Sequence, residues 1–494
     1  MRHLKRRGIR PAAFCSSPRA LPVLSAKAGR KRDLSLRRGG TLGREIGREK
    51  SEEPKAPSAP APETNSHRTC MVQTMVLSLL LISALLPAAF EPVSFLKGYL
   101  AVDSASETRR SAEYLAVPLK EAGLTVRFVE SSPGQVNLLA ELKGTEPALQ
   151  PLILTHHMDT VHPAWPVREA RGIITGSGAL DDKSLGVAHL AALLDAVRVP
   201  PRRGIVFIAV CGEERGGGDG MGHLAAQGLI PPAAVALGEG GRSASAMDKP
   251  LFMNLAVAEK GVLWLEVRKE LVGGHGAGVN ADAELAFCLK KLMDLPRRLP
   301  GTRFYPLVAE YVRWFQRAFP AHARPVPTRA EEVDPALDYM IHTTLNLTSV
   351  ATDGGDNVLP GSIRATLDVR TLDPADHPAV KEMIGRRLPG WTQQVRLELP
   401  PAAPSDPAHP LFRRLLASLE RAHPGLPKGP ALLGGFSDLR HLRQRGISAF
   451  GFSPFFLNFY HEGTVHTRKE AIPRDRFLAG VDLMRSVVHS LCAE

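Results

Sequence analysis

Short apolar runs separated by helix-like stretches dominate residues 124–238. The runs are LTVRFVE, NLLAEL, PLILT, IVFIAVC and AVALG, and stretches such as SLGVAHLAALLDAV and MGHLAAQG lie between them. Apolar runs of this length are typical of buried strands, and strands that alternate with helices build α/β sheets with helices on their faces. The sequence therefore predicts an α/β fold around a buried sheet that is flanked by helices.

Three of these runs end at side chains of the kinds that bind metals. PLILT leads into HHMD at residues 156–159, IVFIAVC leads into Glu213 and Glu214, and AVALG leads into Glu239. Functional residues of open α/β sheets gather at the carboxyl ends of the strands, so we expect these side chains to lie close together. Because a buried carboxylate without a partner is costly, the adjacent pair Glu213–Glu214 is the strongest of these signals.

Two further segments add ligands of the same kinds. GSGALDDKS carries Asp181 and Asp182 before a helix, and TVHTRKE carries His466 with His461 five residues upstream. Spacing alone leaves open which residue acts in each of the pairs His156/His157 and Asp181/Asp182. Two histidines and three carboxylates suit a pair of divalent metals that share one carboxylate. The candidate ligands are His157, Asp181, Glu214, Glu239 and His466.

A different pattern begins near Asn254. NLAVAEKGVLWLEVRKEL alternates like strands with one solvent-facing side, and ADAELAFCLKKLM reads as a helix. After a Pro- and Arg-rich stretch at 295–340, TTLNLTSVA and SIRATLDVRTL read as two more strands. Two strands, a helix and two strands predict a small ferredoxin-like α+β unit inserted into the larger fold. From about residue 375 the α/β pattern resumes.

The positive charge of the chain is concentrated at its start. Residues 1–70 hold 17 of the 62 Lys and Arg residues but only 6 of the 50 Asp and Glu residues, so the remainder is nearly neutral. This segment lacks helical or strand periodicity and predicts a disordered basic extension. A nucleic-acid-binding arm is the functional alternative. We favour the non-functional interpretation and expect no nucleic-acid partner.

Residues 71–90 contain the uncharged run MVLSLLLISALLPAAF. The run is shorter than the roughly 20 residues of a membrane span and has the length of a signal-peptide core, so we expect a signal peptide or membrane anchor. Export to a periplasmic or extracellular space follows from that expectation, and a cytoplasmic location follows if the run is instead a buried helix. The five cysteines show no disulfide or zinc spacing and favour neither compartment.

Taken together, these motifs resemble the aminoacylase / carboxypeptidase S / glutamate carboxypeptidase family of dizinc exopeptidases. That family's pattern runs HxDxV(x)P, GxGAxDDK, EE, a further acid and a late His, and all five parts occur here in order within residues 92–490. The long insertion at 295–340 is most similar to the carboxypeptidase S branch, which includes N-acyl amino acid hydrolases. The resemblance implies a zinc-exopeptidase-type mixed sheet with an inserted lid or dimerisation domain. The implied domains are catalytic at 91–255, lid at 256–372 and catalytic at 373–494.

The resemblance also implies a role for each site residue. It favours His157 over His156 and Asp181 over Asp182. Glu213 would be the general base and acid, and Asp159 would orient His157. One zinc would be held by His157, Asp181 and Glu239, and the other by Asp181, Glu214 and His466. Mn²⁺ or Co²⁺ would also suit these ligands.

Segments of the expected lid match the family as well. LVGGHGAGVNA places His275 to stabilise the oxyanion, often across a dimer, and GGDNVLPGSIRATLDVR places Asn357 and Arg370 to contact the substrate and grip its carboxylate. Two motifs depart from the family. HGxNE reads HTRKE at residues 466–470, and GGTDSR reads GGFSDLR at 434–440, where Gly435 would line the substrate site.

The implied activity is hydrolysis of a peptide or N-acyl amide bond next to an amino acid with a free carboxylate. A carboxypeptidase or dipeptidase is the first expectation, and an aminoacylase acting on N-acyl amino acids is the alternative. A homodimer formed through the lid is the expected assembly. The alternative from another class is an inactive ligand-binding protein on the same fold, but every ligand and the base are present.

Overall fold

The structure is a computed structural model that describes residues 90–493 except 247–248, 280, 300 and most of 301–338, where 307, 309 and 311–313 are described. The expected basic extension and nearly all of the expected signal segment lie outside the described residues. Within the described part of the chain, every helix is too short or too polar to cross a membrane.

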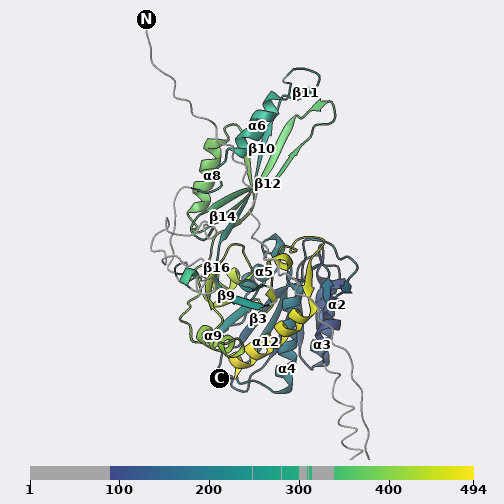
Figure 1. Ribbon diagram of the computed structural model, residues 1–494, viewed down its shortest axis with the longest axis vertical. Helices are drawn as coiled ribbons and strands as arrows, with labels where there is room; N and C mark the ends of the chain where they lie inside the picture. The colour runs from purple at the N-terminus through teal and green to yellow at the C-terminus, as the bar shows by residue number, and fades with distance from the viewer. Residues whose placement is uncertain are drawn as a thin grey trace, which may run out of the picture. The chain divides into compact units, whose positions relative to one another are not determined.

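A mixed sheet of ten described strands forms the larger part of the fold (Figure 1). The strand order is β1 (Val126–Ser132), β2 (Gln135–Leu142), β6 (Ile205–Val210), β3 (Leu152–His157), β7 (Val235–Gly238), β17 (Ala449–Gly451), β9 (Lys249–Glu259), β8 (Arg242–Ala246) and β18 (Phe456–Leu457), and β16 (Lys428–Leu433) pairs with β9. The central strands β6, β3, β7 and β17 run parallel, and β2 pairs with β6 antiparallel.

Helices cover both faces of this sheet. Because successive strand side chains point to opposite faces, Leu152 and Leu154 join one hydrophobic core while Ile153 joins another. The first core is completed by α2 (Pro92–Ala101), α3 (Arg109–Glu121), α4 (Lys183–Arg198), α9 (Pro410–Ala422) and α12 (Arg474–Cys492), and the second by α5 (Met221–Ala226) and α10 (Leu439–Gln444). The predicted α/β fold with a mixed sheet flanked by helices is confirmed.

Local sequence sets the ends of several helices. Pro92 occupies the first turn of α2, where its missing N–H costs nothing, and the Glu91 side chain accepts a hydrogen bond of 2.6 Å from the Ser94 N–H. Beyond the end of α3, Gly123 adopts a φ of +79°, which a glycine reaches without strain. Both helix ends therefore have a local cause in the sequence.

A separate antiparallel sheet has the strand order β12 (Thr344–Thr352), β14 (Ser362–Thr371), β10 (Gly261–Glu270) and β15 (Thr392–Leu399). The helices α6 (Ala283–Met293) and α8 (Asp376–Arg387) share its hydrophobic core. The order along the chain is β10, α6, β12, β14, α8 and β15, which is a β-α-β-β-α-β arrangement. We call residues 261–399 the small-sheet unit.

The boundaries of this unit correct the expected 256–372 lid and the catalytic segment expected from 373. Strand β9 pairs with β8, β16 and β17 in the large sheet, while α8 and β15 belong to the small-sheet unit. Alternation of polar and apolar residues shows that a segment is a strand, but not which sheet supplies its neighbours. That choice is made by pairing between distant segments.

Short elements complete the description and carry parts of the site. They are a two-stranded pair of β11 (Gly274–His275) with β13 (Val358–Leu359), a three-stranded sheet of β19 (Ala471–Pro473), β5 (Ile173–Thr175) and β4 (Arg168–Ala170), the 3₁₀ helix η1 (Glu213–Arg215) and the helix α11 (Phe459–Glu462).

Candidate metal centre

The carboxyl ends of three neighbouring parallel strands converge at one edge of the large sheet. Strand β3 ends at His157, β6 is followed by Glu213 and Glu214, and β7 is followed by Glu239. Since β3 lies between β6 and β7, the residues that follow these strands are brought together by the sheet itself. Asp181 arrives from the loop before α4, and His466 from the loop after α11.

Asp181 lies between the two histidines. Its Oδ1 is 2.8 Å from His157 Nε2, and its Oδ2 is 3.1 Å from His466 Nε2. His466 Nε2 is also 3.2 Å from Glu214 Oε1, and His157 Nε2 is 3.7 Å from Glu239 Oε2. The five residues named as ligands in the sequence analysis therefore form one group of side chains, with Asp181 in the position that a bridging carboxylate requires.

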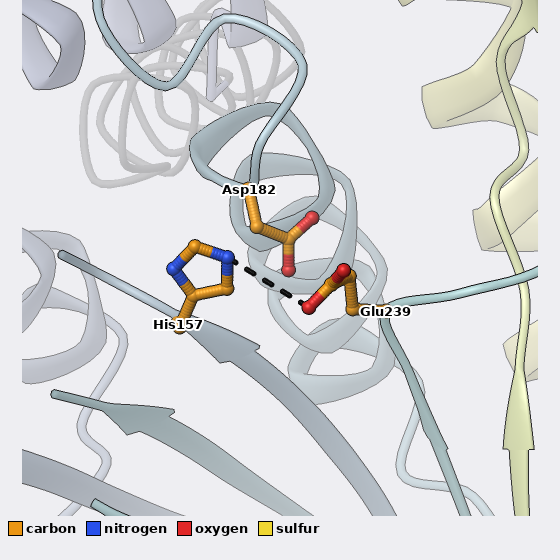
Figure 2. Close-up of side chains that lie close together, drawn as sticks. All are labelled: His157, Asp182 and Glu239. Carbon is orange, nitrogen blue, oxygen red and sulfur yellow. Dashed lines mark ion pairs between the residues drawn. The ribbon is translucent and has the colours of Figure 1, made fainter. Parts of the chain in front are cut away.

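Asp182 also joins this group, although the sequence analysis set it aside in favour of Asp181. Two sets offer ligand atoms that lie within 4.8 Å of one another, namely His157 with Asp181 and Glu214, and His157 with Asp182 and Glu239. Figure 2 shows Asp182, His157 and Glu239 directed toward a common point. We call His157, Asp181, Asp182, Glu214, Glu239 and His466 the carboxylate–histidine cluster.

The electrostatics of the cluster favour a bound cation. Burial raises the pKa of Glu239, and the charge of Asp181 raises it further. Although burial acts in the other direction, hydrogen bonds from His157 and His466 hold the pKa of Asp181 below its usual range. One buried oxygen of Asp182 and one of Glu239 accept no hydrogen bond from the described residues. Mixed carboxylate and imidazole ligands with unpaired oxygens fit divalent metals such as Zn²⁺, Mn²⁺ or Co²⁺.

Asp159 contacts both the histidine and the glutamate pair. Its carboxylate accepts hydrogen bonds of 3.2 Å from the backbone N–H groups of Glu213 and Glu214. His157 Nδ1 is 3.0 Å from the Asp159 carbonyl oxygen and 3.6 Å from the Asp159 carboxylate. Asp159 therefore orients His157 mainly through its backbone, while its side chain ties the end of β3 to the turn that carries the two glutamates.

Glu213 is buried at the start of η1, beside the cluster. Burial raises its pKa well above the usual value, and the charge of Glu239 adds to this effect. The turn depends on glycine, because a Cβ at Gly217, where φ is +69°, would lie 2.4 Å from an oxygen of the buried Asp438. The glycine at position 217 thus has a steric cause.

The backbone of His466 is held in a conformation that few non-glycine residues adopt. Its φ is +58°, which costs of order 1–3 kcal/mol and is found most often at functional sites. Its carbonyl oxygen lies 3.1 Å from His162 Nε2. His461, the alternative ligand, instead lines a pocket with Arg171 and Arg474. Of the two histidines, His466 is the one that reaches Asp181.

His156, the alternative to His157, is turned into the hydrophobic core. Its ring packs against Phe207, and its Nε2 lies 3.4 Å from the Tyr99 hydroxyl. A Cβ at Gly186 on α4 would lie only 2.3 Å from the His156 ring. Because neighbouring residues of a strand point to opposite faces, only one of the two histidines can face the cluster.

Glu470 is a site residue that the sequence analysis missed. Its carboxylate accepts backbone hydrogen bonds from Gly178 at 3.1 Å, Leu180 at 2.7 Å and Asp181 at 2.9 Å. It thereby holds the loop that carries Asp181, and burial raises its own pKa to about 7. The signal was the final acid of HTRKE, which matches the family's HGxNE although the middle of the motif differs.

The predicted site residues of the small-sheet unit do not contact the cluster. His275 and Asn357 are exposed and lie side by side, where the Gly276 N–H donates to the Asn357 carbonyl oxygen. Arg370 donates from Nε and Nη2 to Asp368, at 2.8 and 3.1 Å, and its guanidinium lies over the Phe436 ring. Its buried Nη1 has no hydrogen-bond partner among the described residues. Gly435 precedes Phe436 in the loop after β16.

Comparison with known proteins places this geometry in a family. The model of peptidase family M20/M25/M40 matches residues 153–490. Aminoacylase-1 from Pongo abelii is 23% identical over 401 residues, covering 76% of this chain and 88% of the relative. An N-fatty-acyl-amino acid synthase/hydrolase from Mus musculus is 24% identical, covering 68% of this chain and 73% of the relative.

Solved structures show the same fold. An M20 family metallo-carboxypeptidase from Sulfolobus solfataricus superimposes with a TM-score of 0.64 and 16% sequence identity. The superposition covers 82% of this chain and all of the carboxypeptidase. The resemblance stated from the motifs, to aminoacylases and carboxypeptidases of this type, is confirmed by these matches.

Proposed function

We propose that this chain, which belongs to peptidase family M20/M25/M40 and is a metal-dependent hydrolase, cleaves an amide bond next to an amino acid with a free carboxylate. The bond is a peptide bond in a carboxypeptidase or dipeptidase and an N-acyl bond in an aminoacylase. The placement of Asp181 between His157 and His466 is the observation that supports this proposal most directly.

Two zinc ions are the proposed cofactors. His157, Asp181 and Glu239 are the proposed ligands of one ion, and Asp181, Glu214 and His466 those of the other. Asp182 is an additional candidate, because its carboxylate groups with His157 and Glu239. When bound, such a pair would supply Lewis acidity to the attacking water and the scissile carbonyl.

Glu213 is the proposed general base and acid. Its side chain is buried beside Glu214, and its backbone is fixed by the Asp159 carboxylate. In this position it would take a proton from the attacking water and return it to the leaving amine, so that one residue serves both proton transfers. Since Glu213 is not itself a proposed ligand, its removal separates proton transfer from metal binding.

Arg370 is proposed to bind the substrate carboxylate. The inner fork of its guanidinium is occupied by Asp368, and the unpaired Nη1 supports binding of a further acceptor. His275 and Asn357 are also proposed to act on the bound substrate. His275 would stabilise the oxyanion, and Asn357 would contact the substrate. Because both are exposed in this chain, we propose that they reach a site across a homodimer formed through the small-sheet unit.

An aminoacylase is the second candidate function. Similarity to aminoacylase-1 over 76% of the chain supports it, and the chemistry at the scissile bond is the same. The two candidates differ in the group on the carbonyl side of the bond. A peptidase expects an amino acid there, and an aminoacylase expects an acyl chain.

A hydrolysis panel with measured metal content tests the proposal. The full chain would be assayed against dipeptides, N-acetyl amino acids and long-chain N-acyl amino acids, with metal per chain measured on the same sample. We expect about two metal ions per chain, and chelator-sensitive release of a free amino acid from at least one class. One metal or none per chain, or no hydrolysis of any class when metal is supplied, would overturn it. Asp181→Asn, which alters the proposed shared ligand, should lower the metal content, whereas the matched control Asp406→Asn, at an exposed acid outside the cluster, should not.

A further inference from the structure

His466 is the most exposed of the five residues that the sequence analysis named as ligands. Its side chain is 50% exposed, whereas that of His157 is 1% exposed. Within its loop, residues 463–469, both the N–H and the Oγ1 of Thr467 donate to the Thr464 carbonyl oxygen, at 3.1 and 2.7 Å. These bonds shape the turn but do not fix where it lies relative to the cluster. The φ of +58° at His466 also persists only where surrounding contacts hold it.

His162 contacts the backbone of His466 from a position 304 residues earlier in the chain. Its Nε2 lies 3.1 Å from the His466 carbonyl oxygen. Because a carbonyl oxygen can only accept a hydrogen bond, Nε2 carries the hydrogen and donates it. The bond is made to the residue whose φ is positive, so it acts on the strained backbone itself rather than on a neighbour in the turn.

His162 is in turn anchored by two buried hydroxyl groups. Its carbonyl oxygen accepts hydrogen bonds of 2.9 Å from Thr160 Oγ1 and 2.7 Å from Ser177 Oγ. Ser177 belongs to the loop before α4 that carries Asp181, and His162 lies in the loop that follows His157 at the end of β3. His162 therefore joins three loops that each carry a proposed ligand.

We infer that His162 is a positioning residue for His466 and sets the affinity of the metal ion that His466 binds. The inference rests on the proposed function, which makes His466 a ligand. The Nε2 of His162 donates to a backbone oxygen rather than to a side chain of the cluster, so His162 acts through His466. In the family pattern HxDxV(x)P it takes the variable position before Pro163, and the resemblance assigns it no role.

Without this hydrogen bond, the half-exposed His466 would lose the contact that holds its conformation. Its backbone would relax toward a negative φ, which would move its ring away from Asp181 and Glu214, now 3.1 and 3.2 Å from Nε2. Outer partners that fix a metal ligand contribute about 10–100-fold in metal affinity. The ion at His157 would be affected less, because that ring is buried and is oriented by Asp159.

Calorimetric titration of the metal-free full chain with Zn²⁺ tests the inference. His162→Phe keeps a flat ring but removes the donor, and it should weaken the binding of one of the two ions by about 10–100-fold. His162→Gln, whose side-chain amide can donate in place of Nε2, should recover most of that loss. His466→Ala should abolish binding of the same ion and so identifies which ion is affected. In His162→Phe, kcat should return at saturating Zn²⁺ with an unchanged KM, because the inferred role does not involve the substrate.

His409→Phe is the matched control. His409 is also a half-buried loop histidine whose ring meets a backbone group, since its Nδ1 accepts a hydrogen bond of 3.2 Å from the Leu411 N–H at the start of α9. The control should lower stability without changing the affinity for either ion. Circular dichroism would establish that each variant is folded, and His162→Ala would replace His162→Phe if the latter is not.

Two results would overturn the role of His162 and leave the proposed function standing, provided that His466→Ala still loses one ion. The first is unchanged affinity in His162→Phe, and the second is an equal loss in His162→Phe and His162→Gln, which would show that the donor is not the cause. Retention of both ions by His466→Ala would overturn the proposed ligand set together with the inference.

Discussion

The edge of the large sheet and the small-sheet unit both carry residues that the family resemblance places at the reaction, yet the two regions hold them very differently. At the sheet edge, His157 and Asp159 are almost fully buried, and Asp181 is within 3.1 Å of two histidines. In the small-sheet unit, His275 and Asn357 are exposed. The first set is held in place by contacts within this chain, whereas the second set would act only through the dimer contact proposed above.

The cause of the difference lies in the backbone contacts. Asp159 ties the end of β3 to Glu213 and Glu214, and Glu470 holds the loop of Asp181 through three N–H groups. His275 lies on a two-residue strand whose partner among the described strands is the equally short β13. Charged hydrogen bonds of this kind contribute about 1.5–3 kcal/mol each, which is enough to hold one geometry. Preorganisation at the sheet edge is thus a property of this chain that mutation can measure.

The largest expected effect is at the sheet edge. Glu213→Gln should lower kcat by about 10²–10⁴-fold, because the proton transfers lose their base and acid while the proposed ligands remain. Kinetics with the best substrate and metal content by elemental analysis would measure the two effects separately. Glu141→Gln, at an exposed glutamate, is the control. Near-normal turnover in Glu213→Gln would contradict the assignment.

The next effect tests the small-sheet unit. His275→Ala should lower kcat by about 10²–10³-fold if this exposed histidine stabilises the oxyanion. His489→Ala, another exposed histidine, should have no effect. Mixing the inactive Glu213→Gln and His275→Ala chains should restore measurable activity if the histidine acts across a dimer, since a mixed pair contains one complete site. Full activity in His275→Ala would show that catalysis needs only residues at the edge of the large sheet and not His275.

A smaller effect is expected at Glu470. Glu470→Gln weakens three backbone contacts to the Asp181 loop, so metal affinity should fall by about 10–100-fold, and activity should return at higher metal concentration. Metal titration by calorimetry would measure the change. Glu382→Gln, exposed on α8, is the control in the other region. Unchanged affinity in Glu470→Gln would show that the loop does not need this carboxylate.

The smallest effect concerns stability rather than chemistry. Burial lowers the pKa of His189, on α4, to about 3. Between about pH 6.5 and 3 the unfolded chain binds a proton there that the folded chain does not, so the stability contribution of neutral His189 is lost as the pH falls through that window. At pH 5 the loss is about 2 kcal/mol.

His189→Leu should therefore flatten the decline of Tm on acidification. Burial also lowers the pKa of His377, on α8, but this ring lies 3.0 Å from the Thr371 hydroxyl and 3.2 Å from Glu398. His377→Leu should therefore flatten the decline of Tm on acidification by less than His189→Leu does. Thermal unfolding from pH 7 to 4.5 would compare the two, and equal slopes for His189→Leu and the unchanged chain would contradict the prediction.

Much of the sheet edge was readable before the structure. Buried strands have a strong local signal, and the residues that end them follow from the chain order. The sequence did not reveal that Asp182 joins the cluster or that Glu470 braces the Asp181 loop. Both facts depend on the approach of segments far apart in the chain. The boundaries of the small-sheet unit were misplaced for the same reason, because strand alternation does not name the neighbouring strand.

The sequence by itself determined the strand ends, the ligand types and the family resemblance, since each resides in a short run of neighbouring residues. Only the tertiary structure decided that Asp182 joins the cluster, how Arg370 is paired, and that apolar residues from β16, β18 and the His466 loop line a cavity beside the acids. Distances between segments are set by packing and strand pairing across the whole fold, and a linear order of residues does not contain them.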